Sequence, residues 1–382
     1  MMALTTSNMA KATAFSTAKI PVFGHRKPRH DGLSRYHPSM NIRPIAFAAA
    51  LTLIAGCNPA SNQAARPVLT KTADGRNELK VGFLPVTCHL TCPVTDFASR
   101  TSKDNRFASE KYLAWPDVAN AFKSGRLQAT FMIAPLALKL QEQGVKCKIV
   151  YLGHRDGSTV MVRKDDTSKD LTGLKGKTFA IPSRFSNQFL VIRKLMEDQG
   201  LGESDINFVE LPPPQMPAAL AAKKIDAYFV GEPHAAKAEV TGVGRVLYKA
   251  KDIWPQFISC VLVVSDELIA KEPQVVTDLV RGIAESGEWA ETHRNEAAKV
   301  ASPYYKQDEK LIKFVLNDPG RVSYRQLTPG DEEMMKIVEM AVKAKIISKP
   351  IPVAQFLDRQ FVPKDIKEAT VDMADAGKYP AN

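Results

Sequence analysis

The sequence has few of the features that define several protein classes. It holds only five cysteines in 382 residues, at positions 57, 88, 92, 147 and 260, too few for a fold built from disulfides. The apolar segment 45–54 is far shorter than the roughly 20 residues that a membrane-spanning helix needs. No glycine-rich nucleotide loop, H-E-x-x-H or G-x-S-x-G motif is present. These absences argue against a disulfide scaffold and against the common nucleotide-binding and hydrolytic enzymes.

Positive charge is concentrated near the N-terminus. The net charge is +11, but residues 1–56 carry seven Lys or Arg and one acid, which leaves +5 for the chain from Cys57 onward. That later part has no basic run with interleaved aromatic residues. It therefore lacks the electrostatic pattern of a nucleic-acid-binding protein, whereas a modest positive charge suits an anionic or neutral small ligand.

Residues 40–57 have the order of a bacterial lipoprotein signal peptide. Arg43 supplies the positive charge, residues 45–54 are apolar, and the small pair Ala55-Gly56 precedes Cys57. Cleavage before Cys57 and its lipidation would place the protein outside the cytoplasm, anchored to a membrane on the periplasmic side. The alternative is a buried helix that ends in Gly-Cys.

The residues on either side of this signal are polar. Residues 1–39 are basic and without apolar periodicity, so we expect either that translation starts at Met40 or that they form a disordered extension. Residues 58–77 read as a flexible tether. The four cysteines beyond Cys57 can pair in three ways as two disulfides in an exported protein.

Short apolar strands alternate with amphipathic helices from residue 79 onward, which predicts an α/β fold with parallel sheets covered on both faces. Strands are predicted at 79–84, 129–133, 147–152, 159–162, 178–181, 207–211, 227–230 and 261–264. Helices are predicted at 118–127, 136–143, 188–199, 216–223, 273–291, 294–304, 308–316 and 331–345. The pattern suggests two α/β lobes with a ligand site beyond the carboxyl ends of the strands.

Three segments resemble a known family. They are residues 125–129 (GRLQA) with 134–136 (APL), residues 211–216 (LPPPQM), and residues 224–233 (KIDAYFVGEP). Over residues 79–289 the chain is similar to the solute-binding components of nitrate/sulfonate/taurine/bicarbonate ABC importers. These segments have a physical role, because consecutive prolines fix the backbone at a helix start and helix N-termini attract anions.

The resemblance implies a two-lobed type II periplasmic-binding-protein fold with the ligand cleft between the lobes. Lobe 1 would comprise residues 78–162 plus 262–382, and lobe 2 residues 163–261, with hinges at 162–165 and 257–261. Closure of the lobes would trap the solute. The expected partners are a small solute and the permease and ATPase subunits of the importer. The protein would be a monomer without cofactor or catalysis.

We predict the ligand-binding residues from their positions in the segments that resemble the family and in the strand-to-helix loops. They are Cys88, His89, Thr91, Cys92, Trp115, Pro135, Arg155, Ser158, Arg184, Asn187, Gln215, Gly231, Glu232 and Ser259.

One departure concerns the charged anchors. The resemblance implies that nitrate and bicarbonate binders of the family place a His near the position of Asn187. It also implies a Lys in the segment before the return strand. Here the positions hold Asn187 and residues 258–260 (ISC), which disfavours nitrate or bicarbonate as the ligand. Arg155 and Arg184 can supply replacement charge, or they are solvated surface residues.

A second departure is the loop 87–93 (TCHLTCP). Its thiols and imidazole, Cys88, His89 and Cys92, are suited to a soft metal ion, and Cys260 can approach as a third thiol. The alternatives are a Cys88–Cys92 disulfide, small residues that pack the loop, or a site for an aromatic ligand beside Trp115 and Phe185.

Three functions follow from these observations. The first is an exported, lipid-anchored component of an ABC importer that captures a small anionic or sulfur- or nitrogen-containing solute. The second is an enzyme similar to thiamine-pyrimidine synthases, which export disfavours because that synthesis needs cytosolic substrates. The third is a metal-binding protein that uses Cys88, His89 and Cys92.

Overall fold

The computed structural model describes residues 68–378, and these residues belong to one compact unit. The signal peptide, Cys57 and residues 1–39 lie outside the described residues, so the expectations for them stay predictions. The end of the predicted tether is ordered, because strand β1 (Thr70–Lys71) pairs with β2. Among the described residues, no helix combines the length and apolar character needed to cross a membrane.

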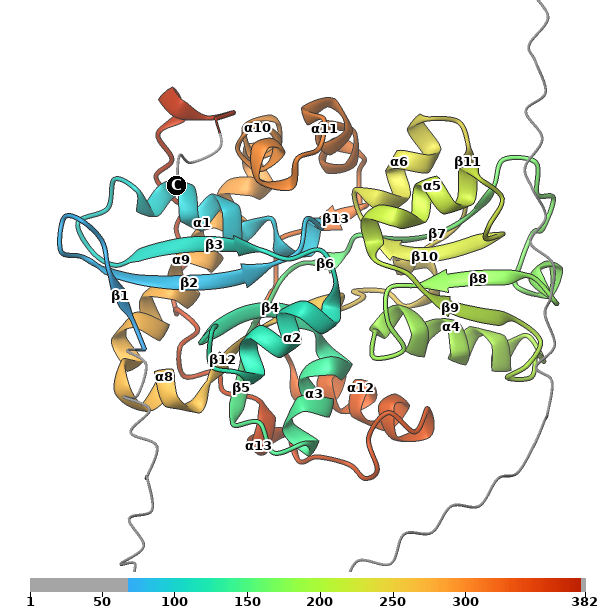
Figure 1. The fold of residues 1–382 in the computed structure, drawn as a ribbon, viewed down its shortest axis with the longest axis horizontal. Coiled ribbons are helices and arrows are strands. Elements are labelled where there is room, and N and C mark those ends of the chain that lie inside the picture. Colours follow the sequence, from blue (N-terminus) through green and yellow to red (C-terminus); the bar gives the residue numbers. More distant parts are fainter. Residues whose placement is uncertain (1–67, 379–382) are drawn as a thin grey trace, which may run out of the picture. The chain divides into compact units, whose positions relative to one another are not determined.

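The first sheet is built from the N-terminal strands and one strand that returns late in the chain (Figure 1). Its order is β1-β2-β4-β12-β5, with β3 also paired to β2. The bounds are β2 (Asn77–Phe83), β3 (Arg106–Lys111), β4 (Ala129–Ile133), β5 (Cys147–Leu152) and β12 (Cys260–Ser265). All five residues of β4 are buried, as expected of a continuous apolar run in the centre of a sheet.

The second sheet is formed by the middle of the chain, in the order β11-β7-β10-β8-β9. Its strands are β7 (Ser158–Arg163), β8 (Thr178–Ile181), β9 (Asn207–Glu210), β10 (Ala227–Gly231) and β11 (Gly244–Lys249). Two short strands, β6 (Arg155–Asp156) and β13 (Val322–Ser323), pair separately. The limits given above for the lobes stay a prediction. Strand pairing puts all of residues 158–163 in the second sheet, although the predicted limit assigned residues 158–162 to lobe 1.

The expectation of parallel sheets is confirmed for only part of each sheet, because both sheets are mixed. Strand β7 runs antiparallel to β10 and β11, and β12 runs antiparallel to β4 and β5. These are the strands by which the chain enters the second sheet and returns to the first. Parallel strands need a crossover connection, usually a helix, that returns the chain to the same end of the sheet. Because the chain passes directly from one sheet to the other, it enters each from the opposite end, and these strands run antiparallel to their neighbours.

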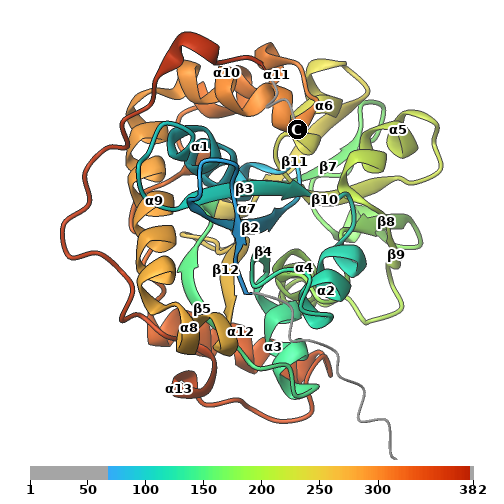
Figure 2. The same cartoon turned by 60° about the vertical axis from the view of Figure 1, so that its left-hand side comes forward.

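Thirteen helices in the described part of the chain cover the sheets. They are α1 (Thr91–Ser99), α2 (Trp115–Lys123), α3 (Ala134–Glu142), α4 (Asn187–Asp198), α5 (Met216–Ala221), α6 (His234–Val240), α7 (Ala250–Ile253), α8 (Asp266–Lys271), α9 (Pro273–Thr292), α10 (Arg294–Tyr305), α11 (Glu309–Asn317), α12 (Asp331–Lys343) and α13 (Val353–Phe356). The long helix α9 packs beside α1 against the first sheet (Figure 2).

Local sequence explains where several of these helices begin. Proline stands in the first turn of α2, α3, α5 and α9, where its missing N–H is not needed. The hydroxyl of Ser186 caps α4 by accepting the N–H of Phe189 at 3.1 Å. The loop expected at residues 87–93 is shorter than predicted, because a 3-10 turn at Thr87–His89 leads directly into α1 at Thr91.

Candidate functional site

The two sheets meet where the chain crosses between them. We call this region the interlobe junction and define it by residues 84–91, 115, 153–159, 186–188, 231–234 and 257–260. The N–H of Thr87, beyond β2, donates to the carbonyl of Glu232, beyond β10, at 2.7 Å. The amide of Asn187 at the start of α4 donates to the carbonyl of Ile258 at 2.5 Å. The carboxyl ends of strands in both sheets therefore contact each other here.

Two cysteine thiols face each other at the junction. The Sγ atoms of Cys88 and Cys260 are 2.7 Å apart, and both residues are 1% exposed. The Ser259 hydroxyl lies 3.6 Å from the Cys88 sulfur and 3.7 Å from the Cys260 sulfur. All four cysteines in the described residues are free thiols, so the Cys88–Cys92 disulfide considered above is not formed.

The two thiols differ in acidity. Burial opposes ionisation of Cys88, but the Cys260 thiol and the imidazole of His89 outweigh it and lower the pKa of Cys88. Burial and the neighbouring Cys88 sulfur raise the pKa of Cys260. The pair therefore favours a single thiolate on Cys88, which is the form that acts as a nucleophile and metal ligand.

His89 is fully buried beside these sulfurs. Its Nδ1 accepts the backbone N–H of Leu84 at 2.7 Å, so the ring proton lies on Nε2. That N–H has no partner. The ring is fixed in place by Trp115, with ring centroids 5.7 Å apart, and by Phe131, at 5.2 Å. His89 therefore presents an unused hydrogen-bond donor within the junction.

Several other buried polar atoms at the junction also lack a partner. Across the described residues such atoms are expected to be rare, because nearly all buried polar groups in native proteins are paired. The junction holds six of them: His89 Nε2, Thr91 Oγ1, Trp115 Nε1, His154 Nδ1, Asn187 Oδ1 and Gln188 Oε1. They come from helices and loops beside both sheets and from residues 153–159, where the chain crosses to the second sheet. A group placed between the lobes can therefore pair with atoms of each.

Gln188 connects the two segments in which the chain crosses between the sheets, residues 153–159 and 257–260. Its amide nitrogen donates to the Ser158 hydroxyl at 3.1 Å and to the Ser259 hydroxyl at 3.4 Å. Its carbonyl oxygen remains unpaired. On the first crossing segment, His154 Nε2 and the Thr87 hydroxyl are 3.0 Å apart. These groups of the junction are all polar and none is an acid or an arginine.

The charged residues near the junction are already paired. Both terminal nitrogens of Arg155 donate to Glu333, at 2.8 and 3.1 Å. Arg321 donates from Nε to Glu232 at 2.8 Å and from its other nitrogens to Glu239 and Asp318. Neither guanidinium is therefore available as the replacement anchor for an anion that the sequence suggested for Arg155.

The structure brings together only some of the predicted site residues. Cys88, His89, Thr91, Trp115, Ser158, Asn187, Gly231, Glu232 and Ser259 belong to the junction, and all are buried. Pro135 is buried in the first turn of α3. Arg184 and Gln215 are exposed, and the Arg184 guanidinium lies over Phe189 on the second lobe.

Cys92 does not join the other two predicted metal ligands. Its sulfur is 3.4 Å from the Ser109 hydroxyl and 3.8 Å from the Val81 carbonyl. Residues 88 and 92 point apart because α1 begins between them, at Thr91. Cys260 takes the place expected of Cys92, and the ligand atoms of Cys88, His89 and Cys260 all lie within 4.8 Å of one another.

His154 and Gln188 belong to the site although the sequence did not single them out. Their only sequence signal is position, directly after β5 and in the first turn of α4. Gly153 was also missed. A Cβ on this glycine would lie 2.1 Å from the carbonyl oxygen of Cys88, so only glycine allows the loop to pack against the crossing segment.

Two threonines on α1 allow a role in solute binding to be distinguished from a role in stability. The Thr91 hydroxyl has no partner, whereas the Thr95 hydroxyl bonds to the Thr91 carbonyl and to Ser286 at 2.8 and 3.0 Å. We expect Thr91→Val to leave solute-free stability unchanged or raised and to weaken solute binding about fivefold to tenfold, the value of one hydrogen bond. We expect Thr95→Val to lower the free energy of unfolding by about 1–3 kcal/mol without changing affinity. Urea unfolding and binding titration of both variants test this.

Burial of His234 predicts a dependence of stability on pH. Burial lowers the pKa of His234 to about 4, and its Nε2 donates to the Pro85 carbonyl across the junction at 3.0 Å. Below the ordinary pKa of about 6.5 the unfolded chain binds a proton that the folded protein does not, so stability falls between pH 6.5 and 4. From pH 7 to 5.5, urea unfolding should show that wild type loses about 1 kcal/mol more than His234→Gln. Equal losses would contradict this assignment.

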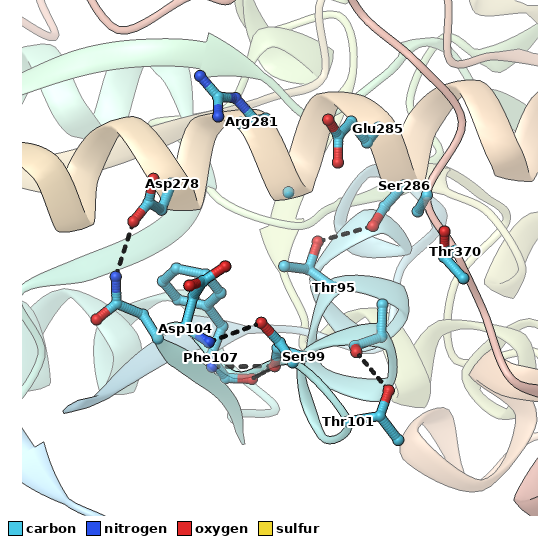
Figure 3. Close-up of a pocket in the computed structure, with 15 residues that line it drawn as sticks. Thr95, Ser99, Thr101, Asp104, Phe107, Asp278, Arg281, Glu285, Ser286 and Thr370 are labelled. Carbon is cyan, nitrogen blue, oxygen red and sulfur yellow. Dashed lines mark hydrogen bonds between the residues drawn. The ribbon is translucent and has the colours of Figure 1, made fainter. Parts of the chain in front are cut away.

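A separate cavity of about 420 Å³ lies on the first lobe, between α1, α9 and the residues before β3 (Figure 3). Two pairs of its polar residues bond to each other, Thr95 with Ser286 and Asn105 with Asp278. None of the predicted site residues lines it. The cavity therefore does not displace the junction as the candidate site.

Comparison with known proteins supports the fold and the family. The chain is 28% identical over 240 residues to the nitrate import ATP-binding protein NrtC of Synechocystis, covering 57% of this chain and 35% of that protein. It is 24% identical to a putative aliphatic sulfonates-binding protein of Bacillus subtilis, covering 60% and 69%. The chain thus spans about a third of NrtC.

A solved structure gives the same result. The ligand-binding component of an ABC-type import system from Staphylococcus aureus, with zinc bound, is 25% identical, with a TM-score of 0.67 over 74% of this chain and 97% of that one. Residues 72–303, well over half of the sequence, match the profile of the NMT1-like family. The α/β fold with two sheets is therefore that of a periplasmic binding protein, and the chain belongs to the NMT1-like family.

Proposed function

We propose that this protein is the extracytoplasmic solute-binding component of an ABC importer and has no catalytic activity of its own. It would capture a small solute at the interlobe junction and deliver it to permease and ATPase subunits. Lipidation at Cys57 would anchor it to the membrane. The observation that carries the proposal is the set of six unpartnered polar atoms buried at the junction.

Pairing of these atoms with a solute would provide the energy for closure. Each buried polar group without a partner costs about 1–3 kcal/mol relative to its hydrated state. In the structure the Thr87 N–H and the His234 ring already bridge the lobes. A solute that pairs with His89 and Trp115 on one side and with Asn187 and Gln188 on the other would stabilise this closed arrangement over an open one.

The lining also limits the solute. Because Arg155 and Arg321 are paired with carboxylates, they do not offer free positive charge to an anion. The available groups are N–H donors of His89 and Trp115, amide oxygens, thiols and the N-termini of α1 and α4. We therefore favour a small solute that carries sulfur or nitrogen, or an inorganic ion with affinity for sulfur, over nitrate or bicarbonate.

The proposal is tested by isolating the exported full-length product from cells and measuring its mass under native and denaturing conditions. We expect a lipid-modified N-terminus at Cys57 and a small solute bound one to one, which denaturation releases. The matched variant is Trp115→Phe, which removes one unpaired N–H and should reduce the bound fraction. If the junction is empty and no small molecule or ion stabilises the protein against heat, the proposal is wrong.

A further inference from the structure

Cys88, His89 and Cys260 form a compact group of soft donor atoms at the junction. Their ligand atoms lie within 4.8 Å of one another, and each residue is at most 1% exposed. They come from two distant parts of the chain, the loop after β2 and the first residue of β12. We propose that Cys88 and Cys260 form a two-thiolate site for a soft monovalent metal ion of the Cu(I) class. This names a solute class for the junction and so rests on the proposed function.

The number of donors decides the kind of metal. A closed zinc site needs four ligands in a tetrahedron, whereas thiolates in small number select soft ions such as Cu(I). In the structure the third sulfur, Cys92, faces Ser109 and Val81, away from the pair. The serine hydroxyl beside the sulfurs, that of Ser259, is a poor metal ligand but a suitable donor to a thiolate. Two sulfurs with supporting hydrogen bonds therefore fit a low-coordinate ion, and binding of the ion would release the proton that Cys260 holds to solvent.

His89 supports the site as a donor. Since the Leu84 N–H occupies Nδ1, the proton of the ring lies on Nε2, and this N–H is unpaired. A protonated nitrogen does not ligate a metal, but it can donate to a thiolate and reduce its negative charge. Helix α1 begins two residues beyond His89 and has no side-chain cap, so its N-terminus also favours negative charge here. His89 is thus a positioning residue.

The sulfurs must separate to admit an ion. Two thiolates on one metal ion with bonds of about 2.3 Å stand roughly 3.5–4.5 Å apart, compared with 2.7 Å between Cys88 and Cys260. Rotation of either side chain about its Cα–Cβ bond supplies this change. The same proximity allows a competing reaction. An exogenous disulfide can oxidise the two thiols to a Cys88–Cys260 disulfide, with two protons and two electrons passing to the exogenous disulfide, which becomes two thiols.

The test is an anaerobic titration of the full-length, reduced protein with Cu(I) against a chromogenic Cu(I) chelator. We expect one equivalent of Cu(I) to bind, and Zn(II) in equal amount not to displace it. Cys88→Ser and Cys260→Ser should each weaken binding by more than about 100-fold, because each removes a ligand. His89→Gln should weaken it by about 10- to 100-fold, as loss of a supporting partner does. Cys92→Ser and Cys147→Ser are matched controls and should bind like wild type.

X-ray absorption of the Cu(I)-loaded wild type keeps the test decisive if a serine variant does not fold. Sulfur neighbours around copper support the site, whereas nitrogen and oxygen neighbours alone overturn it. Absence of stoichiometric Cu(I) binding to the reduced protein, or equal binding by Cys88→Ser and wild type, also overturns it. If Cu(I) fails to bind while native mass spectrometry finds another solute, only this inference fails. If neither is found, the proposed function fails as well.

Discussion

Arg321→Met should lower the free energy of unfolding by about 3–5 kcal/mol, the usual cost of leaving one partner of a buried ion pair alone. Arg321 is 3% exposed and Glu232 is fully buried, and their charged atoms are 2.8 Å apart. Glu232 also accepts bonds from the Thr159 hydroxyl at 2.9 Å and the Ala236 N–H at 2.8 Å, so its carboxylate cannot move out to water. Urea unfolding followed by circular dichroism measures the loss.

Two further variants isolate the cause of this loss. Lys194→Ala breaks an exposed ion pair with Asp198 on α4 and should cost no more than about 0.5 kcal/mol. The double variant Arg321→Met, Glu232→Gln should lose less than the sum of the single variants, because the stranded charge is removed as well. Additive losses would show that Arg321 acts through packing rather than through Glu232.

This ion pair also bears on the site. The backbone of Glu232 accepts the Thr87 N–H from the first lobe and donates to the Gly157 carbonyl, at 2.7 and 2.9 Å. Arg321, beside β13, therefore fixes the end of β10 against the crossing segment. We expect Arg321→Met to weaken solute binding in addition to stability, since the proposed closure would depend on these contacts.

Gly153→Ala should destabilise the protein by about 1–3 kcal/mol or more, the range for forcing extra atoms into a packed interior. The added Cβ would lie 2.1 Å from the Cys88 carbonyl oxygen, an atom of the backbone that cannot rotate away. The N–H of Gly153 also donates to the Cys260 carbonyl at 2.9 Å, so the segment cannot shift without breaking this bond. The Cys88 loop must move instead.

The displaced loop gives a second readout. We expect the buried Cys88 thiol to react faster with a thiol reagent in Gly153→Ala than in wild type under native conditions. Gly202→Ala is the matched control, since the nearest atom to its Cβ is 3.8 Å away, and it should change neither stability nor reactivity. Unchanged stability in Gly153→Ala would mean that the loop does not pack on Gly153 as described.

Sequence periodicity predicted the secondary structure near the site with good accuracy. The bounds of β4, β5 and β8 agree with the predicted strands, because these are short buried runs ended by a helix start or a polar turn. The parallel direction predicted for the strands is wrong for β7 and β12. Strand direction depends on how the chain crosses between sheets, and a short buried run does not by itself determine it.

The site was predicted less completely than the fold. Cys88 and Cys260 are 172 positions apart in the sequence, and only pairing of β12 with β4 and β5 brings them into contact. Spacing instead suggested Cys88 with Cys92, which the start of α1 separates. Arg155 appeared to be a free charge because its partner, Glu333, belongs to a helix near the other end of the chain.

The central claim is that the lobes close around a solute at the interlobe junction. Small-angle X-ray scattering of the exported protein, before and after its bound solute is removed by partial unfolding and refolding, tests this claim most directly. We predict that the radius of gyration rises when the solute is removed and returns to its original value when the solute is restored. A radius that stays constant while the solute binds and dissociates would contradict the account.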